Sequence, residues 1–296
     1  MMDIAFEQVG YAYESFRRSK KKFSPSPQQV SEGDAFALRD ISFAMSSTEC
    51  LAILGRSGSG KSTLMNLFTG LIRPTSGRVT IDAQDIFSGA VQLSSVRQRI
   101  GLVFQFPESQ LFELTVDDDV AYGPRNLGLA EAVVQKRVEE SLEAVGLPVR
   151  DFAKVDPMRL SQGEKRRAAI AGILAMQPEM LIVDEPTAGL DASGREMLIA
   201  MLHDFRRRDI GLVLISHDTS LAAGFARRAL ILDAGCLAYD GDRAMILSDQ
   251  RLALQWGLEM SRALRLADAL FQRNFSKEQV QQLLQDDALF PAAIAG

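Results

Sequence analysis

The chain has 296 residues, 47% of them hydrophobic and 24% charged, which is enough for one large or two moderate globular domains. Its formal net charge of −5 argues against a general nucleic-acid-binding protein, although it leaves a local basic patch open. The two cysteines, Cys50 and Cys236, lie far apart without a C-x-x-C pair, which favours a reducing compartment. The N-terminus lacks signal-peptide features and no window approaches 18 consecutive apolar residues, so we expect neither a signal peptide nor a membrane span.

Residues 3–13 alternate apolar and polar side chains, which predicts a β-strand at the edge of a sheet. Tyr11 and Tyr13 lie at its end. Each is either an ordinary strand aromatic or a platform on which an adenine ring stacks. The position of Tyr13 favours it for the second role.

The composition changes abruptly over residues 15–34, where five of the six residues 17–22 (RRSKKK) are basic. We expect a flexible, solvated insertion between two strands. Most basic runs are simply solvated surface, and the alternative here is contact with anionic lipid headgroups. Residues 35–45 then predict the second strand.

A phosphate-binding loop is predicted between an apolar strand at residues 51–54 and a segment with helical spacing. The pattern Gly55-x4-Gly60-Lys61-Ser62 is complete, so a chance Gly/Ser loop is a poor alternative. Its glycines let backbone N–H groups point at phosphate oxygens, and the following helix presents its positive N-terminal end. Lys61 is expected to reach the β- and γ-phosphates, and Ser62 to ligate Mg²⁺. The predicted nucleotide contacts are Gly55, Ser57, Gly58, Ser59, Gly60, Lys61, Ser62 and Thr63.

Two more strands are predicted at residues 78–82 and 99–106, the second ending at Gln105. Residues 107–172 are predicted to be mostly helical, in contrast to the strands before them, and to form an inserted helical subdomain. Its amphipathic spacing is carried by Val133, Val138, Leu142 and Val145, with Gly146 ending the helix.

Two carboxylates end the next apolar strand, at residues 180–185. We expect Asp184 to hold Mg²⁺ and Glu185 to polarise the attacking water as a general base. Such a pair is common at strand ends, but the upstream phosphate loop favours the catalytic interpretation. A last strand at 211–216 leads to His217, which either contacts the γ-phosphate or is an ordinary loop histidine.

Four features together identify a family. Leu160-Ser161-Gln162-Gly163-Glu164 resembles the LSGGQ signature of ATP-binding-cassette ATPases, and PTAGLD (186–191) resembles the family's D-loop. Gln105 is similar to its Q-loop glutamine and His217 to its switch histidine. The resemblance covers residues 1 to about 235 and implies an α/β P-loop NTPase fold. That fold has a RecA-like parallel-sheet core, an antiparallel β subdomain and the helical subdomain.

The same resemblance implies hydrolysis of Mg-ATP between two ATPase subunits, identical or related. Ser161 and Gly163 then contact the ATP bound by the partner subunit, and the departures Gln162 and Glu164 put the activity of that half-site in question. The implied catalytic residues are Glu185, His217 and Gln105, and the implied Mg²⁺ ligands are Ser62, Gln105 and Asp184.

Residues 101–128 and 163–191 resemble a narrower group, the ATPase subunits of energy-coupling-factor transporters. These import vitamins or cobalt and nickel ions in prokaryotes, with a transmembrane coupling subunit and a membrane-embedded substrate-binding subunit. The resemblance therefore implies a peripheral protein on the cytoplasmic face of the membrane, and the net charge leads us to expect no nucleic-acid partner. The alternative for its docking segment is a surface loop whose Phe106 folds back into the core. The docking residues implied are Phe106, Pro107, Glu108, Gln110, Leu111 and Phe112.

Residues 241–296 predict a small C-terminal helical domain after an ATP-binding domain at 1–240. In the resembling group such a domain holds two ATPase subunits together, and the alternative is packing on its own core. Ser276 and Gln279 predict a capping box for the second helix, after an interruption at 274–275. The apolar positions are Met260, Ala263, Leu264, Ala267, Leu270 and Phe271 in the first helix, and Val280, Leu283 and Leu284 in the second.

We therefore expect the ATPase subunit of an energy-coupling-factor importer. One alternative is the ATPase of another importer, such as one for amino acids or phosphate, against which the FPESQLF segment (106–112) counts. A second is a soluble cassette protein acting on ribosomes or DNA, which usually carries two cassettes or a long coiled coil. A third is a catalytically idle nucleotide binder, against which Glu185 and His217 count.

Overall fold

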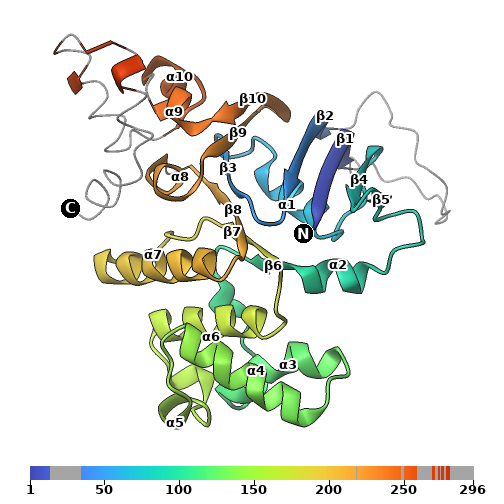
Figure 1. Cartoon of the computed structure of the whole chain (residues 1–296), viewed down its shortest axis with the longest axis vertical. Helices are drawn as coiled ribbons and strands as arrows, with labels where there is room; N and C mark the ends of the chain where they lie inside the picture. The colour runs from blue at the N-terminus through green and yellow to red at the C-terminus, as the bar shows by residue number, and fades with distance from the viewer. Residues whose placement is uncertain are drawn as a thin grey trace. The chain divides into compact units, whose positions relative to one another are not determined.

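The computed structural model describes residues 1–13, 35–217, 219–247, 250–258, 269–270, 273, 275–276 and 278–280 (Figure 1). By its contacts the chain forms two compact units. Unit 1 combines Met1–Val96 with Leu214–Gly296, and unit 2 is Arg97–Val213. The basic insertion at 15–34 lies outside the described residues, as does the first predicted C-terminal helix except for residues 269–270.

Unit 1 contains a four-stranded antiparallel sheet in the order β2-β1-β4-β5. The strand predicted at residues 3–13 is confirmed, but its predicted edge position is wrong, because β1 pairs with β2 on one side and β4 on the other. Alternation reports one buried face of a sheet, a property that central antiparallel strands share with edge strands. The strands are β1 (Asp3–Tyr13), β2 (Ala35–Ser46), β4 (Ser76–Ile81) and β5 (Gln84–Asp85).

The second sheet contributes to unit 1 the order β10-β9-β3, followed by the last residues of β8. Strand β3 (Cys50–Leu54) runs parallel to β9 (Arg228–Asp233), while β10 (Cys236–Asp242) is antiparallel to β9. Leu51 to Leu54 are almost completely buried, as a continuous apolar run in a parallel sheet predicts. Helix α1 (Lys61–Phe68) follows β3 after the glycine-rich loop, as expected.

The described C-terminal residues of unit 1 pack on this sheet. Trp256, Leu258 and Val280 join an apolar cluster with Leu54 of β3 and Ile231 of β9. The predicted capping box is confirmed, since the Gln279 N–H donates to the Ser276 hydroxyl at 3.2 Å and the Ser276 N–H donates to the Gln279 side-chain oxygen at 2.8 Å. The short helices here are α8 (Thr219–Phe225), α9 (Arg243–Leu247) and α10 (Gln250–Gln255).

Unit 2 holds the first residues of β8 (Gly211–Ser216), followed by β7 (Met180–Asp184) and β6 (Ile100–Val103) in that order. Strands β6 and β7 are parallel. The strand predicted to reach Gln105 ends at Val103, because its last partner is Val183 and β7 itself ends one residue later.

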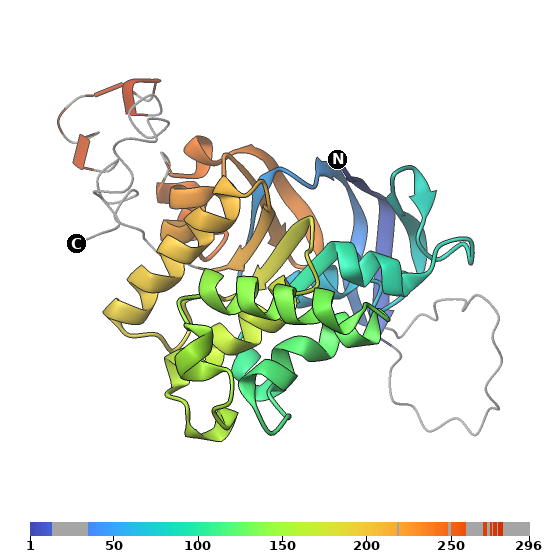
Figure 2. The ribbon, with the colours of Figure 1, turned by 60° about the horizontal axis from the view of Figure 1, so that its bottom comes forward.

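The helical part of unit 2 is built on α3, α4 and α6, which pack against one another (Figures 1 and 2). The helix predicted to end at Gly146 is α4, and this glycine has a φ of 70°. Val133 is 42% exposed and Val134 is buried instead, which places the apolar face of α4 at 134, 138 and 142. The helices between residues 93 and 207 are α2 (Leu93–Arg99), η1 (Pro107–Gln110), α3 (Val116–Asn126), α4 (Glu131–Ala144), α5 (Val149–Phe152), η2 (Pro157–Arg159), α6 (Gln162–Leu174) and α7 (Ala192–Arg207).

Among the described residues, no helix combines the length and the apolar character that crossing a lipid bilayer requires.

Candidate functional site

The loop between β3 and α1 has a backbone that favours glycine at three positions. Gly55, Gly58 and Gly60 have φ values of 146°, 78° and 106°. A Cβ added at Gly55 would lie 2.2 Å from the Leu232 carbonyl oxygen, and one at Gly60 would lie 2.6 Å from that of Ala37. The loop shape therefore depends on both the left-handed backbone and the missing side chains.

The polar groups of this loop fit a phosphate. The Lys61 ammonium reaches back over the loop and donates to the carbonyl oxygens of Gly55, at 2.7 Å, and Arg56, at 2.9 Å. The Ser59 hydroxyl is buried and has no hydrogen-bond partner among the described residues. An ammonium, an unused hydroxyl and the first N–H groups of α1 are the donors that a bound triphosphate needs.

Tyr13 lies beside this loop. Its hydroxyl is 3.1 Å from the Thr63 hydroxyl in the first turn of α1, and its ring meets Tyr11 edge to face at a centroid distance of 4.9 Å. The side chain is 50% exposed, which leaves room for a stacking ligand. This position agrees with the predicted adenine platform, which stays a prediction.

No pattern in the sequence indicates a role for Arg56. Its guanidinium donates to the carbonyl oxygens of Gln255, at 2.8 Å, and Leu254, at 3.4 Å, at the end of α10. Gly257, with a φ of 64°, makes room for it, since an added Cβ would lie 2.2 Å from the Arg56 Nε. These hydrogen bonds connect the phosphate-binding loop to the C-terminal part of unit 1.

In unit 2, the predicted acidic residues lie where β7 ends. Asp184 is its last residue, and Glu185 follows with a φ of 43°, a left-handed conformation that is uncommon for a residue with a side chain. Gln105 lies two residues beyond the end of β6, the parallel neighbour of β7, so it and the two carboxylates lie at the same edge of the sheet. His217 follows the end of β8, in unit 1, and its side chain is exposed.

The signature segment begins α6 with a capping box. The Ser161 hydroxyl accepts from the Glu164 N–H at 3.4 Å, while the Glu164 carboxylate accepts from the Ser161 N–H at 2.8 Å and its hydroxyl at 2.7 Å. These hydrogen bonds hold the pKa of Glu164 below its usual value. Glu164, one of the two departures from the family pattern, therefore orients Ser161.

The predicted docking segment includes η1 and lines a pocket of about 310 Å³. Phe112 is 61% exposed and packs edge to face on Tyr122 of α3 at a centroid distance of 4.9 Å. Phe106 is 52% exposed, so it does not fold back into the core. The lining includes Gln110, Leu111 and Phe112 from the segment, together with Tyr122 and Met176.

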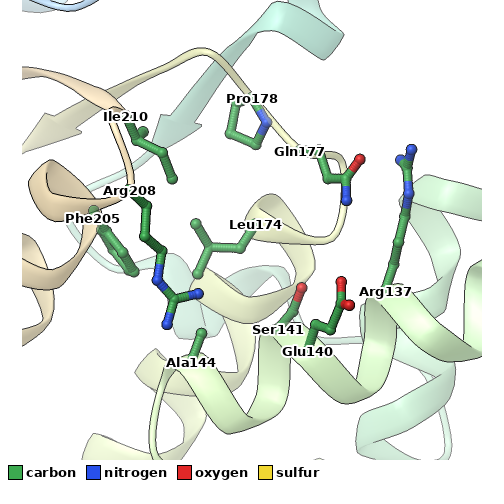
Figure 3. A pocket seen from close by; sticks show the side chains of 10 residues that line it. All are labelled: Arg137, Glu140, Ser141, Ala144, Leu174, Gln177, Pro178, Phe205, Arg208 and Ile210. Carbon is green, nitrogen blue, oxygen red and sulfur yellow. The ribbon is translucent and has the colours of Figure 1, made fainter.

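A second pocket of unit 2, of about 240 Å³, lies between α4, the end of α6 and the end of α7 (Figure 3). Leu174 and Phe205 contribute apolar surface, and Arg208 forms an ion pair with Asp204 at 2.8 Å. None of the predicted site residues lines this pocket.

Known proteins resemble this chain in sequence. A family model described as ABC transporter matches residues 38–188. The energy-coupling factor transporter ATP-binding protein EcfA2 of Symbiobacterium thermophilum is 44% identical over 280 residues, which cover 93% of this chain and 90% of the relative. The cobalt import ATP-binding protein CbiO of Rhodobacter capsulatus is 44% identical over 235 residues, covering 79% and 83% of the two chains.

Two solved structures are similar in fold. One is cbiO1 from Clostridium perfringens, part of the ABC transporter complex cbiONQ, with a TM-score of 0.71 and 29% identity over 90% of this chain and 98% of that one. The other is an ATP-binding cassette in a dimeric post-hydrolysis state bound to ADP and phosphate. Its TM-score is 0.66 and its identity 27%, over 81% of this chain and 98% of that one.

Proposed function

Because this chain belongs to the ATP-binding-cassette transporter family, we propose that it powers an energy-coupling-factor importer for a vitamin or a transition-metal ion. It is an ATPase with the predicted α/β P-loop fold. The names of its relatives support the importer class, since they include both energy-coupling-factor and cobalt-import subunits.

The observation that carries the importer proposal is the pocket beside residues 106–112. A pocket rimmed by the exposed ring of Phe112 and by Tyr122 suits an apolar segment of a partner, because aromatic side chains are enriched where interfaces bury surface. We propose that a coupling helix of a transmembrane subunit binds there. A further proposed partner is a membrane-embedded substrate-binding subunit, and we place this chain as a peripheral subunit on the cytoplasmic face of a prokaryotic membrane.

In the proposed reaction, Lys61 and the loop N–H groups hold the β- and γ-phosphates of ATP. A Mg²⁺ ion held by Ser62, Asp184 and Gln105 would neutralise charge on the phosphates, as oxygen ligands of this kind allow. Glu185 accepts a proton from the attacking water, and His217 donates to the γ-phosphate. The position of Glu185 directly after β7, beside Asp184, supports this role.

The second half of each site is proposed to come from a second ATPase subunit, either another copy or a related chain. Its Ser161 and Gly163 close the open side of the triphosphate, as the dimeric state of the ADP-bound relative supports. The hydroxyl of Ser161 is at an exposed helix N-terminus, where an anion is favoured.

The test is purification of the tagged chain with its native partners and identification of every subunit by mass. Phe112→Asp should lose the membrane subunits, because a charge in the pocket rim opposes burial of an apolar helix. Val133→Asp is the matched control, since Val133 is an exposed apolar residue on α4 that does not line the pocket. Co-purification of the wild type with ribosomes or DNA, or membrane subunits retained by Phe112→Asp, would contradict the proposal.

A further inference from the structure

Two side chains on one face of α6 connect the signature segment to the rest of unit 2. Gln162 and Arg166 are four residues apart, so they lie on the same side of the first turns of the helix. Gln162 is exposed, whereas Arg166 retains only 6% of its accessible surface. No contact of either side chain was predicted from the sequence.

Arg166 binds two separate loops. Its guanidinium donates to the carbonyl oxygen of Gln105 at 3.1 Å and to that of Ala188 at 3.0 Å. Gln105 follows β6, and Ala188 lies in PTAGLD (186–191) directly after the carboxylates that end β7. The planar fork of an arginine can donate to both carbonyls at once, which a lysine ammonium cannot reproduce with the same geometry.

The docking segment meets the same face. The Gln162 amide donates to one carboxylate oxygen of Glu108 in η1. The other Glu108 oxygen is buried and lacks a hydrogen-bond partner among the described residues. Burial lowers the pKa of Arg166, and the charge of Glu108 opposes that shift, so the two ionised groups act on each other.

From these contacts we propose that Arg166 is a positioning residue that joins the docking segment, the Gln105 loop and the 186–191 loop to the signature helix. A shift of the docking segment then moves the side chains of the ATPase site together with Ser161. This inference rests on the proposed function, because it takes residues 106–112 to be where the membrane subunit binds. Gln162, the second departure from the family signature, gains a role as the link to Glu108.

The first test is a double-mutant cycle in the assembled transporter complex. Arg166→Lys should lower kcat for Mg-ATP by about tenfold or more with a smaller change in KM, because misplacing reacting groups mainly slows the chemical step. In a Gln105→Ala background the same substitution should cost less than in the wild type, because the Gln105 side chain that Arg166 positions is already gone while the backbone carbonyls of residues 105 and 188 remain. Independent, multiplying effects would overturn the proposal.

Arg137→Lys is the matched control for a purely structural role. Arg137 also donates to a backbone carbonyl, that of Ala175 at 3.4 Å, but it contacts neither loop. We expect its kcat within about twofold of wild type, and thermal midpoints of both lysine variants within a few degrees of wild type. Equal losses of kcat for the two variants would overturn the positioning role.

If Arg166→Lys does not fold, Gln162→Ala tests the inference instead. Gln162 is exposed, so its substitution is expected to leave the fold intact. The readout is the ratio of the ATPase rate in the complex to that of the isolated cassette subunits. We expect this ratio to fall by about threefold or more, since the link from docking segment to signature is cut. An unchanged ratio would overturn the inference, whereas a wild-type chain that never assembles with membrane subunits would instead defeat the proposed function.

Discussion

The phosphate-binding loop of unit 1 and the face of α6 in unit 2 are fixed by different means. The loop is shaped by its backbone, through three glycines with positive φ values and through Lys61 donating to loop carbonyls. The α6 face is held by side chains that cross between segments, with Arg166 bound to carbonyls 61 and 22 residues away in the sequence. A site shaped by its backbone can be predicted from the residue pattern of the sequence, whereas a site held by contacts between distant side chains is seen only in the structure.

The largest effect is expected at Glu185, the carboxylate that the sequence predicts to be the general base. Glu185→Gln should lower phosphate release by about 100-fold or more, because an amide cannot accept the proton of the attacking water. ATP binding should persist, since the phosphate loop is untouched. Phosphate release and nucleotide affinity measured side by side test this, and equal release rates for variant and wild type would remove Glu185 from catalysis.

The second prediction tests whether the loop is truly shaped by its backbone. Gly60→Ala should lower the free energy of unfolding by about 2–3 kcal/mol and weaken ATP binding, because the new Cβ meets Ala37 and Leu38 at 2.6 Å in a left-handed backbone. Gly58→Ala is the matched control, with a φ of 78° but no atom within 4 Å of the added Cβ. It should cost only about 1 kcal/mol. Similar urea midpoints for both variants would refute the steric part of the argument.

These two regions also show which parts of the fold and of the candidate site can be predicted from the sequence. The apolar run before Gly55 and the glycine spacing predicted β3, the loop and α1 correctly, because strand burial and left-handed turns demand particular residue types. Alternation in residues 3–13 predicted a strand but not its place in the sheet, which depends on partners distant in sequence. The same holds for Arg56 and Arg166, whose partners are backbone carbonyls and leave no pattern in residue type.

A smaller effect is expected at the N-terminus of α6. Glu164→Gln should lower stability by about 1 kcal/mol or less at pH 7, because it weakens the capping box around Ser161. The folded-state pKa of Glu164 lies below its ordinary value of 4.5, so this stabilisation is present above about pH 4.5 and is lost as the pH falls through the folded pKa. The gap between the urea midpoints of wild type and variant should therefore narrow on acidification. A gap that widens would contradict the assignment.

The smallest effect concerns the link between the phosphate loop and α10. Arg56→Met should cost about 0.5–1 kcal/mol, because it removes exposed hydrogen bonds to the carbonyls of Gln255 and Leu254. Arg39→Met is the control, since Arg39 is also an exposed arginine and its guanidinium lies over the ring of Phe36. Hydrogen exchange of residues 250–258 provides the measurement. Equal protection of this segment in both variants would show that the link contributes nothing.

We expect ATP bound by one chain to be hydrolysed only when the signature segment of another subunit completes the site. The direct measurement is the ATPase rate per chain alongside the paired fraction, from light scattering, as the protein is diluted and a second cassette subunit is added. The expected ATPase rate per chain rises and falls with the paired fraction. A rate per chain that stays at its full value when every chain is monomeric would contradict it.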